Sequence, residues 1–174
     1  MSAQARHQHP ELGLLGWEVA ETDVVFSFLT DDQARTRVYP EWSAADVLRH
    51  LVWWHESFAA IVAGCADGGR PSTPGGSLAQ VNARGVEELA AVSPRRLRGR
   101  LRAAQRLIED RAPDLPYRRG GRRYTVGQRI GIAAGEMRQH RRDVVRALLG
   151  ATAQRTRPVS PGDASGTADR AGGH

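Results

Sequence analysis

Three residues of the sequence have the types and the spacing of a metal site: Glu136, His140 and His50. Glu136 and His140 lie four residues apart in a segment with a helical pattern, and side chains four apart share one helix face. His50 lies in an earlier segment of the same kind. One carboxylate and two imidazoles suit zinc, and also ferrous iron, and leave a coordination position open. The spacing is equally compatible with an ordinary ion pair between Glu136 and His140, with His50 hydrogen-bonded elsewhere.

The segment that carries His50 predicts a helix with a well-defined start. Ser43 can accept hydrogen bonds from the first-turn amides, and Asp46 three residues later completes a variant of the capping box. The helix ends near Cys65, before a glycine-rich loop at 68–76. Its apolar residues recur at intervals of three and four: Val47, Leu51, Trp54, Phe58 and Ile61. His50 flanks this stripe.

The last helix is expected to begin after Thr125 and to stop at Gly150. Its stripe has a heptad-like spacing: Val126, Ile130, Ala133, Met137, His140, Val144 and Leu148. His140 should therefore point inward, with Glu136 at the edge of the stripe. A carboxylate that faces a core is costly unless it is paired or bound to a metal.

Other helical patterns cover residues 11–29, 77–92 and 94–113, the third with Ser93 as N-cap and a proline in the first turn. Residues 117–124 predict a small hairpin around a Gly-Gly turn. We expect an all-α four-helix bundle. The long connection between the second and third main helices allows those two helices to run parallel. The bundle is expected to span residues 1–150, and residues 151–174 lack periodicity and predict a disordered tail.

Composition adds broad limits. All 25 basic residues among the 174 are arginine, and the formal net charge is +6. The single cysteine, Cys65, cannot form an internal disulfide and fits a reducing compartment. The first ten residues have no apolar core of the kind a signal peptide needs, and no stretch reaches the roughly 20 apolar residues of a membrane span. We therefore expect a cytoplasmic protein that does not enter a membrane.

The residues around these candidates resemble the DinB-like superfamily. The resemblance rests on Glu41-Trp-Ser-Ala-Ala-Asp-Val-Leu-Arg-His50-Leu paired with Glu136-x-x-x-His140. It implies a four-helix bundle with a metal at His50, Glu136 and His140. The superfamily more often has His-x-x-x-His in the last helix. The glutamate at position 136 instead resembles the His, Glu, His set of mycothiol-dependent maleylpyruvate isomerases. The middle of the chain, including Asn82, looks closer to the DfsB branch, which holds colibactin self-protection proteins.

The resemblance implies a metal-dependent enzyme, a hydrolase or a thiol transferase, in which a divalent ion activates water or a thiol for attack on a small reactive metabolite. Zinc is the expected metal, with nickel or iron as alternatives, and a thiol such as mycothiol is a second cofactor. Such a protein would serve detoxification, self-resistance or a natural-product step. A mycothiol-dependent S-transferase or isomerase is the alternative, and related bundles often form homodimers.

Several residues have competing interpretations. Trp54, Met137 and Arg138 are candidates for the substrate pocket. We expect His55 to be a surface or interface histidine. We expect Cys65 to be a small core residue and not a nucleophile, because no base is identifiable beside it. Arginines are concentrated in the third main helix and in the hairpin. An alternative function is therefore that of a non-catalytic protein that sequesters a ligand or binds nucleic acid. Leucines interleaved with the helix arginines place those charges on an outward face, which argues against nucleic acid.

Overall fold

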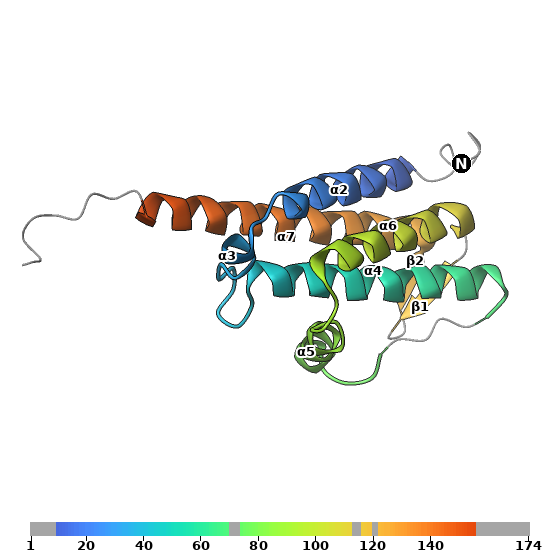
Figure 1. The fold of residues 1–174 in the computed structure, drawn as a ribbon. Coiled ribbons are helices and arrows are strands. Elements are labelled where there is room, and N and C mark those ends of the chain that lie inside the picture. Colours follow the sequence, from blue (N-terminus) through green and yellow to red (C-terminus); the bar gives the residue numbers. More distant parts are fainter. Residues whose placement is uncertain (1–9, 70–73, 113–115, 120–121, 156–174) are drawn as a thin grey trace, which may run out of the picture.

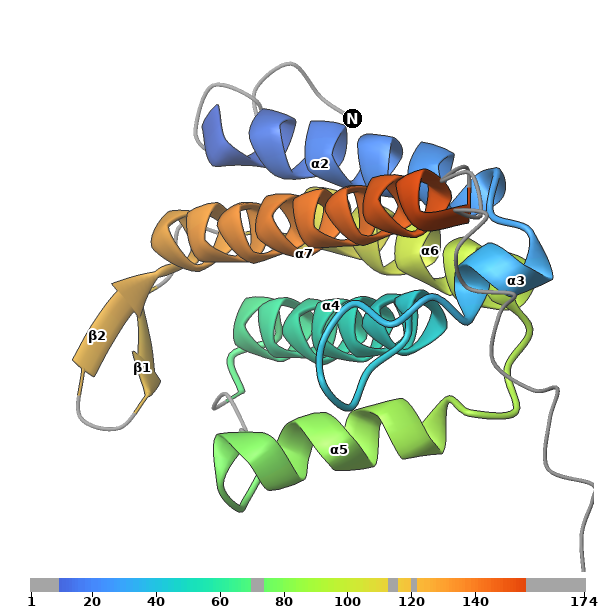
Figure 2. The same cartoon turned by 90° about the vertical axis from the view of Figure 1, so that its left-hand side faces the viewer.

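Four long helices form the bundle in the computed structural model, which describes residues 10–69, 74–112, 116–119 and 122–155 (Figure 1). They are α2 (Pro10–Ser27), α4 (Ala44–Ala66), α6 (Pro94–Arg111) and α7 (Val126–Arg155). Helix α2 packs mainly against α7, and α4 against α6 (Figure 2). The two members of each pair run in the same direction, and the pairs are antiparallel to each other (Figure 1). The all-α bundle with a long crossover between the second and third main helices is confirmed.

Local sequence explains the helix starts. Ser43 and Asp46 form a complete capping box at the start of α4, and Thr30 caps the short helix α3 (Asp31–Ala34) in the same way. Ser93 caps α6, with Pro94 in its first turn. These signals fix where α4 begins, and therefore which residues of α4 face α7.

The crossover between α4 and α6 contains α5 (Leu78–Glu88), which ends four residues before the expected end at 92. It packs closely against α4 at Gly85. A Cβ atom at this position would sit 2.7 Å from the Trp53 ring, so only glycine permits this approach. Two tryptophans of α4 hold α5 by hydrogen bonds: Trp53 Nε1 donates to Glu88, and Trp54 Nε1 donates to Asn82 at 2.8 Å. Helix α5 thereby covers one side of α4.

The predicted hairpin is present as β1 (Pro116–Arg119) and β2 (Arg122–Thr125), which pair antiparallel before α7. Its Gly-Gly turn lies outside the described residues. The predicted stop at Gly150 is wrong, because α7 continues to Arg155. A helix-ending glycine adopts a positive φ angle, and in the described chain only Gly68 and Gly76 do so. The rest of the predicted tail, residues 156–174, lies outside the described residues.

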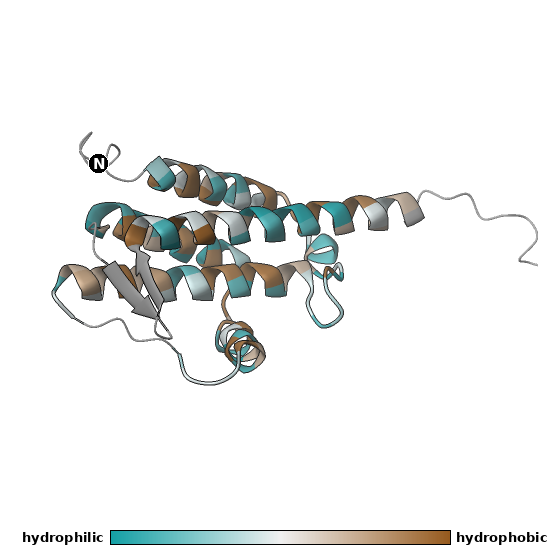
Figure 3. Cartoon of the chain, turned by 180° about the vertical axis from the view of Figure 1, so that it is seen from behind, coloured by the Kyte–Doolittle hydropathy of each residue, from teal (hydrophilic) through white to brown (hydrophobic). Residues whose placement is uncertain are grey.

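The core combines apolar residues from all four long helices, among them Leu15, Val47, Val52, Leu101 and Ile130. Helix α2 lacks a clean apolar stripe because Glu18 and Thr22 are fully buried while Trp17 and Val24 are exposed. Figure 3 shows a hydrophilic stretch in the middle of α7, and this stretch takes part in both the α2 and the α4 contacts described below. None of the described helices combines the length and the apolarity that a bilayer crossing requires.

Candidate functional site

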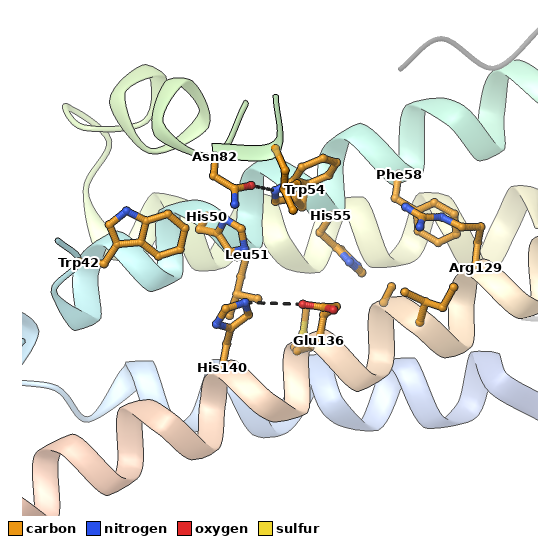
Figure 4. A pocket seen from close by; sticks show the side chains of 14 residues that line it. Trp42, His50, Leu51, Trp54, His55, Phe58, Asn82, Arg129, Glu136 and His140 are labelled. Carbon is orange, nitrogen blue, oxygen red and sulfur yellow. Dashed lines mark hydrogen bonds and ion pairs between the residues drawn. The ribbon is translucent and has the colours of Figure 1, made fainter. Parts of the chain in front are cut away.

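His50 of α4 and His140 of α7 meet across the bundle (Figure 4). Their ring centroids lie 4.9 Å apart, with the ring planes at 72°. Trp42, which precedes α4, packs on the other side of His50 at a centroid distance of 4.7 Å. The tryptophan and the helix start thus hold the His50 ring toward α7.

Glu136 lies one turn before His140, at the rim of the same site. Its Oε2 is 3.8 Å from His140 Nε2, and its side chain is 69% exposed. In the chain from 10 to 155, leaving out the undescribed gaps, no three His, Cys, Asp or Glu side chains are arranged ready to ligate one ion. His50, Glu136 and His140 are therefore neighbours around one space, and the carboxylate would have to turn inward to complete a ligand set.

Tyr39 and Asp143 determine which nitrogen of His140 carries the proton. The Tyr39 hydroxyl donates to Asp143 Oδ2 at 2.7 Å and lies 2.8 Å from His140 Nδ1. A phenol has one hydrogen, so when it goes to Asp143 the His140 Nδ1–H must donate to the Tyr39 oxygen. The neutral His140 then keeps its lone pair on Nε2, the nitrogen nearer Glu136. This chain of partners is the arrangement that orients a metal-binding histidine.

Both imidazoles are held neutral. Burial and the proximity of His140 lower the pKa of His50 to about 3. Burial also lowers the pKa of His140, and the nearby carboxylates Glu136 and Asp143 oppose that shift. His50 Nδ1 is buried and has no hydrogen-bond partner among the described residues. A buried nitrogen without a partner is costly unless something binds it.

The histidines open onto a cavity of about 460 Å³ between α4, α5 and α7. Most of its wall is apolar or aromatic: Trp42, Leu51, Trp54, Phe58, Leu78, Ile132, Ala133 and Met137. Asn82, Arg129 and His55 supply further polar groups. A second cavity of about 520 Å³ adjoins it and shares Trp42, Asn82 and His140. This site has the size and the mixed lining of a small-molecule pocket.

Arg138 lies elsewhere, and its expected place in the substrate pocket is wrong. One residue of helix turns a side chain by about 100°, so Met137 lines the cavity while Arg138 faces α2. There its Nε donates to Glu18 Oε1 at 2.5 Å. The arginine of the cavity is Arg129, whose guanidinium lies 5.7 Å over the Phe58 ring. Arg129 lies seven residues, or two helical turns, before Glu136, so the sequence already indicated that the two side chains share one face of the helix.

His55 is also placed differently from the expectation. It is 3% exposed and lines the cavity, so the interpretation as a surface or interface histidine is wrong. Its Nε2 lies 3.0 Å from Gln105 Oε1 of α6. Helix α4 is covered on several sides, by α6, α7 and α5, so two residues about 140° apart can both be buried. Cys65 is buried near the end of α4, as expected, and burial raises its pKa.

Four α6 arginines have acidic partners, one of them Arg111, which pairs with Asp67 just after α4. Arg98 and Arg102 both pair with Asp23 of α2, and Arg100 binds Glu56 of α4 through two hydrogen bonds of 2.6 Å. Arginines engaged in this way join helices and are less able to contact phosphate groups. This pairing weakens the nucleic-acid interpretation.

Comparison with known proteins gives a family. The model of the mycothiol maleylpyruvate isomerase N-terminal domain matches residues 16–145. The chain belongs to this family. No curated protein sequence gives a significant match. The fold is similar to the crystal structure of a mycothiol-dependent maleylpyruvate isomerase, in a His-to-Ala variant, with a TM-score of 0.63 and 10% identity. The match covers 78% of this chain and 59% of the other, so the chain spans less than two thirds of that protein.

Proposed function

We propose that the chain is a metal-dependent thiol transferase or isomerase that acts on a small electrophilic molecule. The observation that carries the proposal is the meeting of His50 and His140 over one cavity, with the His140 proton held on Nδ1 by Tyr39 and Asp143. Two neutral imidazoles and an adjacent carboxylate suit zinc better than magnesium or calcium. Mycothiol is the proposed thiol because the family and the similar structure carry that name.

The residues present fit such an ion. His140 Nε2 and an imidazole nitrogen of His50 would be two ligands, and Glu136 would be the third after its exposed side chain turned inward. A divalent ion held there lowers the pKa of a thiol or of water and so supplies a nucleophile at neutral pH. Tyr39 fixes the His140 ring, since a ring held by a second partner keeps its lone pair directed at one point. The aromatic and aliphatic cavity wall limits access of bulk water to that point.

Activation of water instead of a thiol is the second candidate, and it would make the protein a hydrolase of reactive metabolites. The same three residues would serve both reactions. The family relationship favours the thiol. Detoxification, self-protection or a biosynthetic step are roles open to either reaction.

Metal analysis of the full chain without a histidine tag tests the proposal. Protein loaded with zinc and dialysed should retain one ion per chain, and His140→Ala should lose it. Gln139→Ala is the matched control, because Gln139 is the exposed neighbour on the same helix and, among the described residues, its amide donates hydrogen bonds only to Asp143. Zinc-loaded protein should also convert mycothiol to its thiolate at neutral pH, measured by ultraviolet absorbance. Retention of zinc by His140→Ala, or no zinc in the unmodified chain, would refute the proposed site.

A further inference from the structure

A third imidazole of the cavity, that of His55, has no part in the proposed metal site. His55 lies five residues after His50 on α4, and the residue is 3% exposed. It lines the same cavity as His50 and His140 (Figure 4). A histidine enclosed in a bundle interior is unusual unless hydrogen bonds satisfy it. Its hydrogen bonds therefore indicate what it can do.

A relay of side chains from α6 sets the proton of His55. Gln105 Nε2 donates to Glu109 Oε1 at 2.9 Å, and a carboxylate can only accept, so the amide oxygen of Gln105 faces His55. That oxygen lies 3.0 Å from His55 Nε2 and also can only accept. The hydrogen of the neutral ring is therefore on Nε2. Nδ1 carries the lone pair.

We propose that His55 Nδ1 accepts the proton of the thiol that reacts in this cavity. This inference rests on the function proposed above. The S–H bond breaks, its proton forms an N–H bond at Nδ1, and the electron pair stays on sulfur to attack the electrophilic carbon. The imidazolium then returns the proton to the atom of the substrate that gained the electron pair, or to solvent where a leaving group departs with that pair. An imidazole oriented by a third group is the usual base for such a nucleophile.

The surroundings of His55 keep its lone pair available. Burial lowers the pKa of His55 to about 4, against the opposing effect of Gln105, so the ring is neutral at neutral pH. The same burial disfavours the imidazolium, so the transfer requires the thiolate that forms beside the ring. The other charged or titratable groups that line the cavity are His50, His140, Glu136 and Arg129. Once the proton moves, a thiolate and an imidazolium stabilise each other by their opposite charges. If His55 had a purely structural role, only a hydrogen-bond donor toward Gln105 would be needed at this position. The side-chain amide of a glutamine would supply that donor equally well.

Nitrogen NMR of the zinc-loaded full chain, with ¹⁵N in its histidines, tests the transfer directly. The His55 signals are assigned by their loss in His55→Gln. Mycothiol is added at neutral pH while thiolate absorbance is followed. We expect His55 to change from the neutral ring with hydrogen on Nε2 to the imidazolium in step with thiolate formation. Thiolate formation with His55 still neutral would overturn the inference and leave the proposed function intact. Absence of both zinc and thiolate would overturn both.

Thiol transfer from mycothiol to monobromobimane supplies a second readout. His55→Gln retains a donor toward Gln105, and we expect its kcat to fall by about 10²–10⁴-fold with zinc content unchanged. Gln105→Glu keeps an acceptor for His55 and adds a negative charge. It should keep transfer active and move the acidic limb of the pH–rate profile to higher pH. Unchanged kcat in His55→Gln, or an unmoved limb in Gln105→Glu, would assign His55 a purely structural role.

Discussion

Helix α7 uses its two sides in opposite ways. Toward α2, Glu18 is completely buried, and Arg138 and Arg141 both bind its carboxylate, at 2.5 and 2.9 Å. Toward α4, His50 and His140 are enclosed without a counter-charge that bonds them directly, and the nearest carboxylate, Glu136, points largely to solvent. The first contact is closed by charge pairs. The second surrounds a cavity.

This difference separates structural from functional polar groups. The Glu18 carboxylate is balanced in charge by two arginines, Arg138 through a hydrogen bond and Arg141 through an ion pair, so it serves to join two helices. His50 Nδ1 has no hydrogen-bond partner in the part of the chain that the structure describes, and the ring is kept neutral. Polar groups left unsatisfied beside a cavity are typical of a site that binds something. Variants on each side of α7 should therefore affect different properties.

The largest effect on stability is expected on the α2 side. Glu18→Ala removes the carboxylate but leaves two arginines at a closed helix contact, and we expect a loss of about 3 kcal/mol in the free energy of unfolding. Arg138 is 38% exposed, which limits the loss because water can solvate it. Glu136→Ala is the matched control and should change stability by less than about 0.5 kcal/mol. Urea unfolding of metal-free protein measures both, and equal losses would remove the distinction between the two sides.

The next effect concerns metal binding on the α4 side. Tyr39→Phe removes the oxygen that holds His140 Nδ1, and we expect zinc affinity to fall by about 10–100-fold. Competition with a chromophoric chelator measures the affinity. Gln139→Ala changes the same network at Asp143 without touching Tyr39 and should leave affinity nearly unchanged. The same affinity in Tyr39→Phe as in the unmodified chain would mean that Tyr39 does not orient a ligand.

The sequence predicted much of this architecture because its signals are local. Capping residues such as Ser43, and apolar residues at intervals of three and four, define α4 without help from the rest of the fold. The end of α7 was missed because a glycine can stay helical when the helix continues beyond it, as Gly150 does. The buried face of α2 was predicted imprecisely because it includes Glu18, and the burial of Glu18 depends on arginines over a hundred residues later in the chain.

The candidate site was predicted only in part, for the same reason. Glu136 and His140 are neighbours by helix geometry, whereas their approach to His50 depends on how the helices pack. Tyr39 comes from a loop, so nothing local indicated that it contacts His140. Asp143 could have been suspected, since it lies three residues after His140 on the same face. The burial of His55 depends on α6, which supplies Gln105.

An intermediate effect is expected from pH. His55 is neutral when folded, with a pKa of about 4, and regains an ordinary pKa near 6.5 when unfolded. The unfolded chain therefore binds more protons between these values, so stability is full above pH 6.5 and falls as the pH decreases toward 4. His50 acts in the same direction. His55→Gln should reduce the slope by about 1.4 kcal/mol per pH unit. Urea unfolding with a chelator present, at several pH values, measures it, and an unchanged slope would mean that His55 is not held neutral.

The smallest effect is expected for an ion pair at the surface of the bundle. Arg100 and Glu56 join α6 to α4 with side chains 42% and 30% exposed, so solvent screens them far more than Glu18. A double-mutant cycle of Arg100→Ala and Glu56→Ala should give a coupling of about 0.5–1 kcal/mol. A coupling near zero would mean that Arg100 is not committed to the fold and is available to an anionic partner. A coupling as large as the loss expected for Glu18→Ala would mean that exposure to solvent does not set the strength of these charge pairs. The contrast drawn from the buried Glu18 would then fail.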